Sequence, residues 1–228
     1  MKITVTSDTH SRHKFISKGD LPGGDLLIHA GDITMRGYET EVIQFLDWFS
    51  SLYQYETKIF IAGNHDFYFE ENPTKIREIL KRYPDIIYLE NEHFNLNGIK
   101  IFGSPIIPNF NNWAFNVDRM SERMIDYRKM IPKNTDILIT HTPPKHSLDV
   151  SNYMNEHCGC EVLETRIDEI KPKINVFGHV HSSYGYKFNG HTHMINASAL
   201  GARNEYQNPP LTFEWDKKEN DINFLNIY

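Results

Sequence analysis

The chain has 228 residues and a formal net charge of −6 at pH 7, a length that supports one substantial core and predicts a single domain over residues 1–228. Proteins that grip long duplex nucleic acid usually carry a basic surface, so the acidic total argues against such a partner. Two cysteines, Cys158 and Cys160, are too few for a disulfide framework. The chain starts with a strand-like segment, and no apolar run approaches membrane-spanning length, so we expect a cytoplasmic protein without a membrane partner.

Five short apolar runs occur along the chain, and each predicts a buried strand that ends in a loop. They are Ile3–Thr6, Leu26–Ile28, Lys58–Ala62, Asp136–Ile139 and Lys173–Phe177. Helices are expected between them, where apolar residues follow helical spacing: over 42–49, over 73–80 with Asn72 as the N-cap, and over 162–170.

Turn signals become frequent in the second half of the chain. Asn97-Gly98 and Asn189-Gly190 each separate two strand-like runs and predict hairpins. A third hairpin is expected between 211–215 and 222–227. The pattern predicts α/β units first and antiparallel strands later, packed as two sheets flanked by helices.

Blocks of metal-binding residue types come directly after the five apolar runs. In order they are Asp8-Thr9-His10, Gly31-Asp32, Gly63-Asn64-His65-Asp66, Thr140-His141 and Gly178-His179-Val180-His181. Their carboxylates, imidazoles and amide oxygen suit divalent ions such as Mn, Fe or Zn, and the absence of thiolate disfavours a closed structural zinc site. A single block is weak evidence, since a lone His141 is more often a buried, hydrogen-bonded histidine. Together, at the exits of successive strands, the blocks predict a two-metal hydrolase.

This series of blocks resembles the pattern D-x-H, G-D, G-N-H-[DE], H, G-H-x-H of the calcineurin-like metallophosphoesterase superfamily, over roughly Asp8 to Asn196. Within it the chain looks most similar to the MPPED-type (UPF0046, brain protein 239-like) phosphodiesterases. That likeness lies in stretches such as Ser7–Arg12, Phe102–Pro105, Trp113–Asn116, Thr140–Pro144, Cys158–Cys160 and Asn208–Pro210. The resemblance implies an α/β fold, the four-layer αββα sandwich with two mixed β-sheets flanked by helices.

The resemblance also implies which residues hold two divalent cations. One cation would be bound by Asp8, His10, Asp32 and His181, and the other by Asp32, Asn64, His141 and His179, so that the Asp32 carboxylate bridges them. Mn is the expected metal, with Fe, Zn, Mg and Ni as alternatives. A water between two such cations loses a proton near neutral pH and can attack phosphorus as metal-bound hydroxide. Some MPPED-type proteins carry glycine at the position of His181, and the histidine here implies that both metal sites are complete.

His65 is expected beside the metals rather than on one of them. It would donate to a phosphoryl oxygen or protonate the leaving alkoxide, with Asp66 fixing its orientation.

Substrate contacts are expected from two arginines and an aromatic cluster. Arg12 and Arg36 could bind phosphate, although a solvated surface arginine is the alternative for each. Phe110, Trp113 and Phe115 could form a surface against which a nucleobase stacks, with core packing as the alternative.

The sequence therefore predicts a phosphodiesterase that hydrolyses a small phosphodiester, with a cyclic nucleotide as the expected substrate. A nuclease acting on nucleic-acid ends and a phosphomonoesterase are enzymatic alternatives. A non-catalytic scaffold of the same fold is a further alternative, and the intact set of expected ligands argues against it. The oligomeric state is left open.

Overall fold

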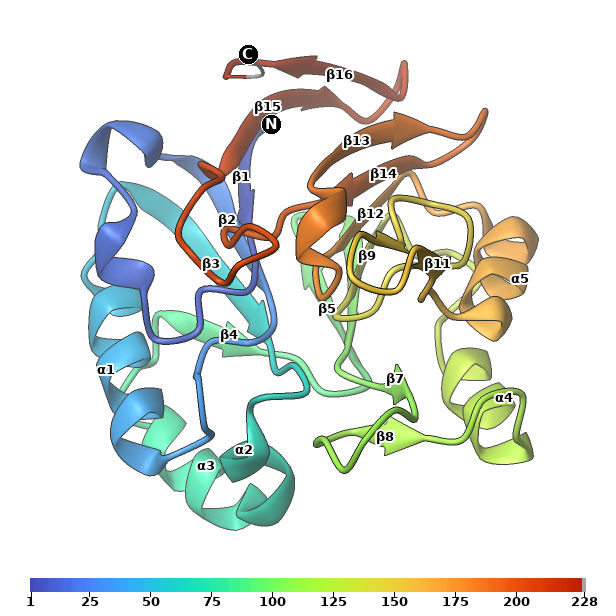
Figure 1. Cartoon of the computed structure of the whole chain (residues 1–228). Coiled ribbons are helices and arrows are strands. Elements are labelled where there is room, and N and C mark those ends of the chain that lie inside the picture. The colour runs from blue at the N-terminus through green and yellow to red at the C-terminus, as the bar shows by residue number, and fades with distance from the viewer. Residues whose placement is uncertain (227–228) are drawn as a thin grey trace.

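Two six-stranded β-sheets lie face to face in the computed structural model, which describes residues 1–226. Helices cover the outer face of each sheet (Figure 1). The four-layer αββα architecture expected from the resemblance is thereby confirmed.

The first sheet contains the N-terminal strands. Strands β1, β2, β3 and β4 run parallel, with β4 at the edge, and β15 and β16 extend the sheet antiparallel on the other side. In spatial order the strands are β16 (Asp221–Phe224), β15 (Leu211–Asp216), β1 (Lys2–Thr6), β2 (Gly24–Ala30), β3 (Tyr55–Ile61) and β4 (Ile86–Tyr88). The predicted C-terminal hairpin is confirmed as β15–β16, while Ile227 at its expected end lies outside the described residues.

The second sheet corrects in part the expectation of α/β units first and antiparallel strands later. Its four central strands, β6, β9, β12 and β14, are parallel, because helices α4 and α5 provide the crossovers from β6 to β9 and from β9 to β12. Only the edge strands are antiparallel, and they form the two predicted Asn-Gly hairpins. The spatial order is β13 (Gly185–Phe188), β14 (His193–Asn196), β12 (Ile174–Phe177), β9 (Ile137–Thr140), β6 (Ile99–Ser104) and β5 (Glu92–Leu96).

Alternating side chains along each strand supply two hydrophobic layers. In β2, Leu26 and Ile28 belong to the core between the sheets, whereas Leu27 packs beneath the helices. All three are fully buried. This two-sided burial explains why the strands appear in the sequence as continuous apolar runs.

The helices are α1 (Glu39–Ser50), α2 (Phe67–Glu71), α3 (Pro73–Leu80), α4 (Glu122–Lys129) and α5 (Glu161–Ile170). Three were predicted, but Asn72 makes no side-chain cap bond at the start of α3. At α5 the cap is the Cys160 sulfur, which accepts from the Leu163 amide. Helix α4 was not predicted because it buries only Met124 and Arg128, too few residues to show an apolar stripe.

Shorter elements complete the chain. They are the pairs β7 (Ile107–Pro108) with β8 (Asn116–Val117) and β10 (Val150–Ser151) with β11 (Glu156–His157), and the 3₁₀ turns η1 (His13–Phe15), η2 (Lys18–Asp20) and η3 (His181–Ser183). None of the helices within residues 1–226 has the length and hydrophobicity needed to cross a bilayer.

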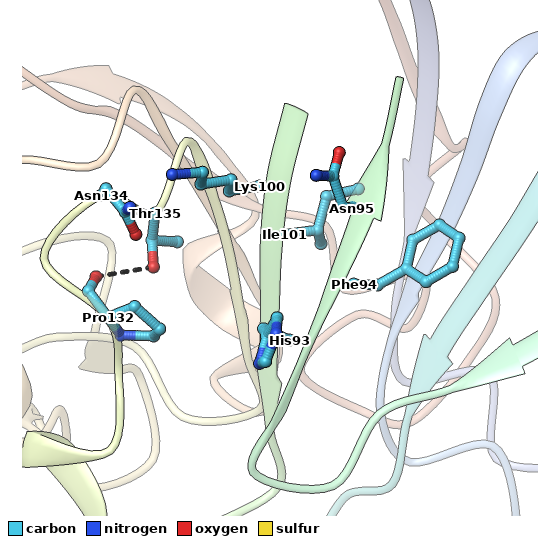
Figure 2. A pocket seen from close by; sticks show the side chains of 8 residues that line it. All are labelled: His93, Phe94, Asn95, Lys100, Ile101, Pro132, Asn134 and Thr135. Atoms are coloured by element: carbon cyan, nitrogen blue, oxygen red, sulfur yellow. Dashed lines mark hydrogen bonds between the residues drawn. The ribbon is translucent and has the colours of Figure 1, made fainter. Parts of the chain in front are cut away.

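A cavity of about 370 Å³ lies at the edge of the second sheet, between strands β5 and β6 and the segment after α4 (Figure 2). Its lining includes His93 and Lys100, but no carboxylate from the described part of the chain. This donor set is unsuited to divalent cations.

Candidate metal centre

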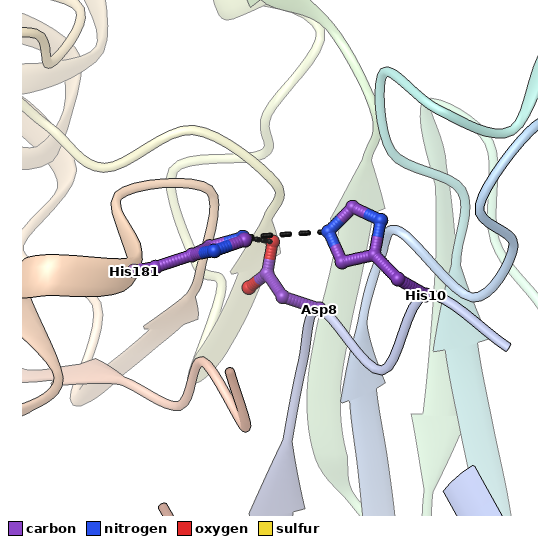
Figure 3. A group of neighbouring side chains, drawn as sticks. All are labelled: Asp8, His10 and His181. Carbon is purple, nitrogen blue, oxygen red and sulfur yellow. Dashed lines mark hydrogen bonds and ion pairs between the residues drawn. The ribbon is translucent and has the colours of Figure 1, made fainter. Parts of the chain in front are cut away.

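The predicted ligands come together where strands of both sheets end. Asp8 and His10 follow β1, and His181 follows β12 on the other sheet. Figure 3 shows the rings of His10 and His181 directed toward one another, with the Asp8 carboxylate beside them. The His10 and His181 Nε2 atoms are 3.3 Å apart, and His181 Nε2 lies 3.4 Å from Asp8 Oδ1. These three side chains form the first ligand group.

A second ligand group consists of Asp32, His141 and His179. His141 Nε2 lies 3.3 Å from Asp32 Oδ2 and 3.0 Å from Asn64 Oδ1. The same Asp32 oxygen lies 3.5 Å from His10 Nε2 of the first group. Asp32 Oδ2 therefore lies between the two groups, where a bridging carboxylate is expected.

The spacing of these donor atoms fits divalent cations. Oxygen and nitrogen ligands about 2.1 Å from one ion, at tetrahedral or octahedral angles, are about 3.0–3.4 Å from each other. Four of the five separations, 3.0–3.4 Å, fall in this range, and the fifth, His10 Nε2 to Asp32 Oδ2, is 3.5 Å. The donor set, carboxylates and imidazoles with one amide oxygen, is also the one such ions prefer.

An unusual backbone conformation directs several of these side chains inward. Asp8, His10, Asp32 and His179 have φ values of 51°, 41°, 54° and 68°. This left-handed region is uncommon for residues other than glycine and is frequently found at functional sites. Both Asp8 oxygens accept from the His179 amide at 3.0 Å, which fixes the end of β1 against the end of β12.

Two glycines of the motifs are required by close approach. A Cβ on Gly63 would lie 2.3 Å from Asp32 Oδ1, and a Cβ on Gly178 would lie 2.0 Å from Asp8 Oδ2. Any larger residue would therefore displace a carboxylate of the centre.

Charges within the centre pair across the two sheets. Burial raises the pKa of Asp8, but the hydrogen bond and charge of His181 outweigh it and hold that pKa below its usual value. Burial lowers the pKa of His141, but the charge of Asp32 outweighs it and raises that pKa to about 9. Burial lowers the pKa of His10 to about 4 and that of His179 to about 3. These two imidazoles are therefore neutral near pH 7 and keep a lone pair available for a cation.

Backbone contacts fix the tautomers of two histidines. His141 Nδ1 donates to the Ala30 carbonyl at 2.9 Å, which directs its Nε2 atom toward Asp32. His65 Nδ1 donates to the Met35 carbonyl at 2.8 Å, and its ring packs edge-on against His10 with centroids 4.5 Å apart. His65 thus presents Nε2 at the border of the centre.

Asp66 does not have the predicted contact with His65. Its buried carboxylate accepts from the amides of Ile33, Thr34 and Gly63 and from the Thr34 hydroxyl, at 2.7–3.2 Å. The expectation that Asp66 orients the His65 ring is corrected: Asp66 holds the loops after β2 and β3 together, and the Met35 carbonyl holds the ring. A backbone carbonyl has no residue-type signal, so the sequence could not reveal this contact.

The centre opens into a cleft of about 340 Å³. Trp113 lines it, with its ring 4.1 Å from the His65 ring, and Phe110 lines it with its ring 5.2 Å from that of His179. One face of Trp113 is thus occupied by the His65 ring.

The other predicted substrate contacts do not line this cleft. Phe115 is only 5% exposed and belongs to the hydrophobic core beneath the helices, which decides for the packing alternative. The Arg36 side chain is exposed and does not line the cleft. Arg12 donates to the carbonyl of Asn204, a residue that lines the cleft, but Arg12 itself is not part of the lining. Sequence reasoning missed Tyr153 and Met154, which do line it.

Comparison with known families agrees with this geometry. Residues 1–183 match the family model of the calcineurin-like phosphoesterases. The chain belongs to this family. It is thus a metallophosphoesterase, a metal-dependent phosphoric ester hydrolase by family, and its histidine and aspartate groups are consistent with the dinuclear metal site typical of these proteins.

Curated relatives share most of the chain. It is 36% identical to metallophosphoesterase domain-containing protein 1 of Homo sapiens, over 93% of this chain and 70% of that protein. A UPF0046 protein of Caenorhabditis elegans is 32% identical over 96% of this chain and 76% of its own length. The predicted resemblance is confirmed by both.

Solved structures support the fold. The crystal structure of TT1561 of Thermus thermophilus superposes with a TM-score of 0.65, covering 99% of this chain and 98% of that one, at 15% identity. At this identity the likeness concerns the fold alone.

Proposed function

We propose that this chain is a phosphodiesterase that hydrolyses a small phosphodiester, with a cyclic nucleotide as a candidate substrate. The observation that carries the proposal is the composition of the cleft beside the metal centre. No lysine or arginine from residues 1–226 lines it. A phosphomonoester carries up to two negative charges and is commonly held by arginine, whereas a diester carries one. An arginine-free cleft therefore favours the diester.

The residues of the two groups would hold two divalent cations, for which we expect Mn. When bound, such ions supply a nucleophile near neutral pH and offset charge on the phosphoryl oxygens. Asp32 would belong to both ligand sets, because its Oδ2 lies near His10 and His141, and Asn64 would add its amide oxygen to the second group.

His65 would transfer a proton to the leaving oxygen from Nε2. Its Nδ1 proton is held by the Met35 carbonyl, which orients the ring so that Nε2 faces the centre. Trp113 covers one face of the ring and excludes water from that side.

Turnover and metal content together test the proposal. The protein is loaded with Mn and assayed with 2′,3′-cyclic, 3′,5′-cyclic and linear dinucleotide substrates, and with p-nitrophenyl phosphate as a monoester. We expect about two bound metal ions per chain and faster hydrolysis of a diester than of the monoester. Preference for the monoester would refute the diesterase assignment, and bound metal without any turnover would favour the scaffold.

We further propose a cytoplasmic location, supported by free thiols at Cys158 and Cys160. Recovery of the protein in a secreted or membrane fraction would contradict it.

A further inference from the structure

The hairpin of β10 and β11 is fastened to the metal centre. The Val150 carbonyl accepts from the hydroxyls of Ser182 and Ser183 at 3.0 and 2.8 Å, and Ser182 Oγ accepts from the Asn152 amide at 3.1 Å. Both serines belong to the turn η3, which begins at the expected ligand His181. The hairpin therefore keeps a fixed position relative to that ligand.

The base of the hairpin is held from the other side as well. The buried Asp149 carboxylate accepts from His157 Nδ1 at 2.7 Å and from the Gly159 amide at 3.0 Å. Arg119 donates to the carbonyls of Cys158 and Gly159 at 2.8 and 2.9 Å. These contacts hold the base of the hairpin on two sides.

The tip presents apolar side chains to the cleft. Tyr153 is 97% exposed and Met154 is 54% exposed, and both line the cleft with Phe110, which is 40% exposed. A single exposed apolar residue needs no explanation, but three around one cleft indicate a binding surface.

Trp113 and the hairpin adjoin different histidines of the centre. The His10 ring contacts the His65 ring at 4.5 Å and the His181 ring at 5.2 Å. Trp113 packs against His65, whereas the hairpin is bonded to the turn of His181. Trp113 and the hairpin tip both line the cleft, so a phosphodiester bound there has two contact surfaces available for its two ester groups: the Trp113 wall and the hairpin wall.

Resting on the proposed function, we propose that Tyr153 and Met154 bind the second ester group of a linear phosphodiester, and that this group is flat and apolar or aromatic. The first ester group lies beside Trp113. A cyclic nucleotide has a single base and leaves one wall empty, so a diester with a ring on each side fills the cleft better. The absence of lysine and arginine among the described lining residues fits such a singly charged ligand.

Equilibrium binding measures the contribution of Tyr153 and Met154 apart from that of Trp113. Diphenyl phosphate, methyl phenyl phosphate and dimethyl phosphate carry the same charge and have two, one and no rings. Each is titrated calorimetrically into the Mn-loaded protein, into a Tyr153→Ala, Met154→Ala double variant, and into Tyr53→Ala. Tyr53 is a matched control because it is 86% exposed and does not line the cleft.

The double variant should bind diphenyl phosphate about tenfold more weakly, a loss typical of one stacked ring. Its affinity for methyl phenyl phosphate should change by less than about twofold, because a single ring can still use the Trp113 side. Tyr53→Ala should match the wild type, and metal content should be equal in all three proteins. Equal affinity of wild type and double variant for diphenyl phosphate, or equal losses for both aromatic ligands, would overturn the proposal.

Turnover distinguishes this inference from the proposed function. If the wild type hydrolyses bis(p-nitrophenyl) phosphate, the double variant should show a KM about tenfold higher at unchanged kcat. Turnover without differential binding would refute the second wall and leave the phosphodiesterase standing. Differential binding without turnover would support the wall and refute the phosphodiesterase.

Discussion

Replacing Gly178 by alanine should displace the Asp8 carboxylate from the metal centre. The added Cβ would lie 2.0 Å from Asp8 Oδ2 and 2.2 Å from Ser7 Oγ. A carbon–oxygen contact needs about 3.3 Å, so the carboxylate or the end of β12 must shift by about 1.3 Å. The carboxylate cannot swing aside freely, because it is fully buried and both its oxygens accept from the His179 amide.

The expected cost of Gly178→Ala is about 1–3 kcal/mol of unfolding free energy, the usual range for overpacking. A ligand displaced by about 1 Å should lower turnover at least about 10²-fold. Urea unfolding, metal analysis and hydrolysis of bis(p-nitrophenyl) phosphate measure the three effects. Gly19→Ala is the control, since its nearest neighbour would be Ser17 Oγ at an ordinary 3.5 Å. A folded Gly178→Ala protein with wild-type turnover and two metals would refute this reasoning.

Three further substitutions test other parts of the structure. Asp32→Ala should abolish hydrolysis of any phosphoester, because one oxygen of this carboxylate faces both ligand groups. The far-UV circular dichroism spectrum should stay unchanged. Near-normal turnover would exclude a carboxylate shared between the two groups. His65→Gln should keep both metals and lose about 10²–10⁴-fold in turnover, less for good leaving groups, and loss of a metal equivalent would show that His65 is a ligand. Burial lowers the pKa of His13 from 6.5 to about 4. Between these pH values the unfolded chain binds a proton that the folded chain does not. The free energy of unfolding should therefore fall by up to about 3 kcal/mol as the pH drops from about 6.5 through 4. His13→Phe should flatten this part of the dependence of unfolding free energy on pH, and an unchanged slope would contradict the assignment.

The five ligand-bearing strands could be predicted because burial on both faces makes each a continuous apolar run that ends at a polar block. The strand pairing of the second sheet could not be predicted from the sequence. Helix α4 turns only two residues, Met124 and Arg128, into the core, so its crossover role and the parallel pairing of β6 with β9 were not visible.

The metal ligands could be predicted from the sequence because each one follows its strand directly. The substrate contacts could not, because they depend on the direction in which the loops turn. Phe115 adopts a left-handed backbone and turns into the core, which residue type alone does not reveal. Tyr153 shows no sequence pattern that distinguishes it from any surface tyrosine, and its place at the cleft depends on bonds from the hairpin to η3.

Both ligand groups draw side chains from both sheets. The first takes Asp8 from β1 and His181 from beyond β12, and the second takes Asp32 from β2 and His141 from β9. A bound cation would therefore link the two sheets at this end of the sandwich, in addition to the apolar packing and the hydrogen bonds that already join them. By mass action, each tenfold rise in free metal above its dissociation constant adds about 1.4 kcal/mol of stability per ion. The lifetime of the folded protein would then follow the metal supply of its surroundings, and scarcity would loosen this end of the sandwich first.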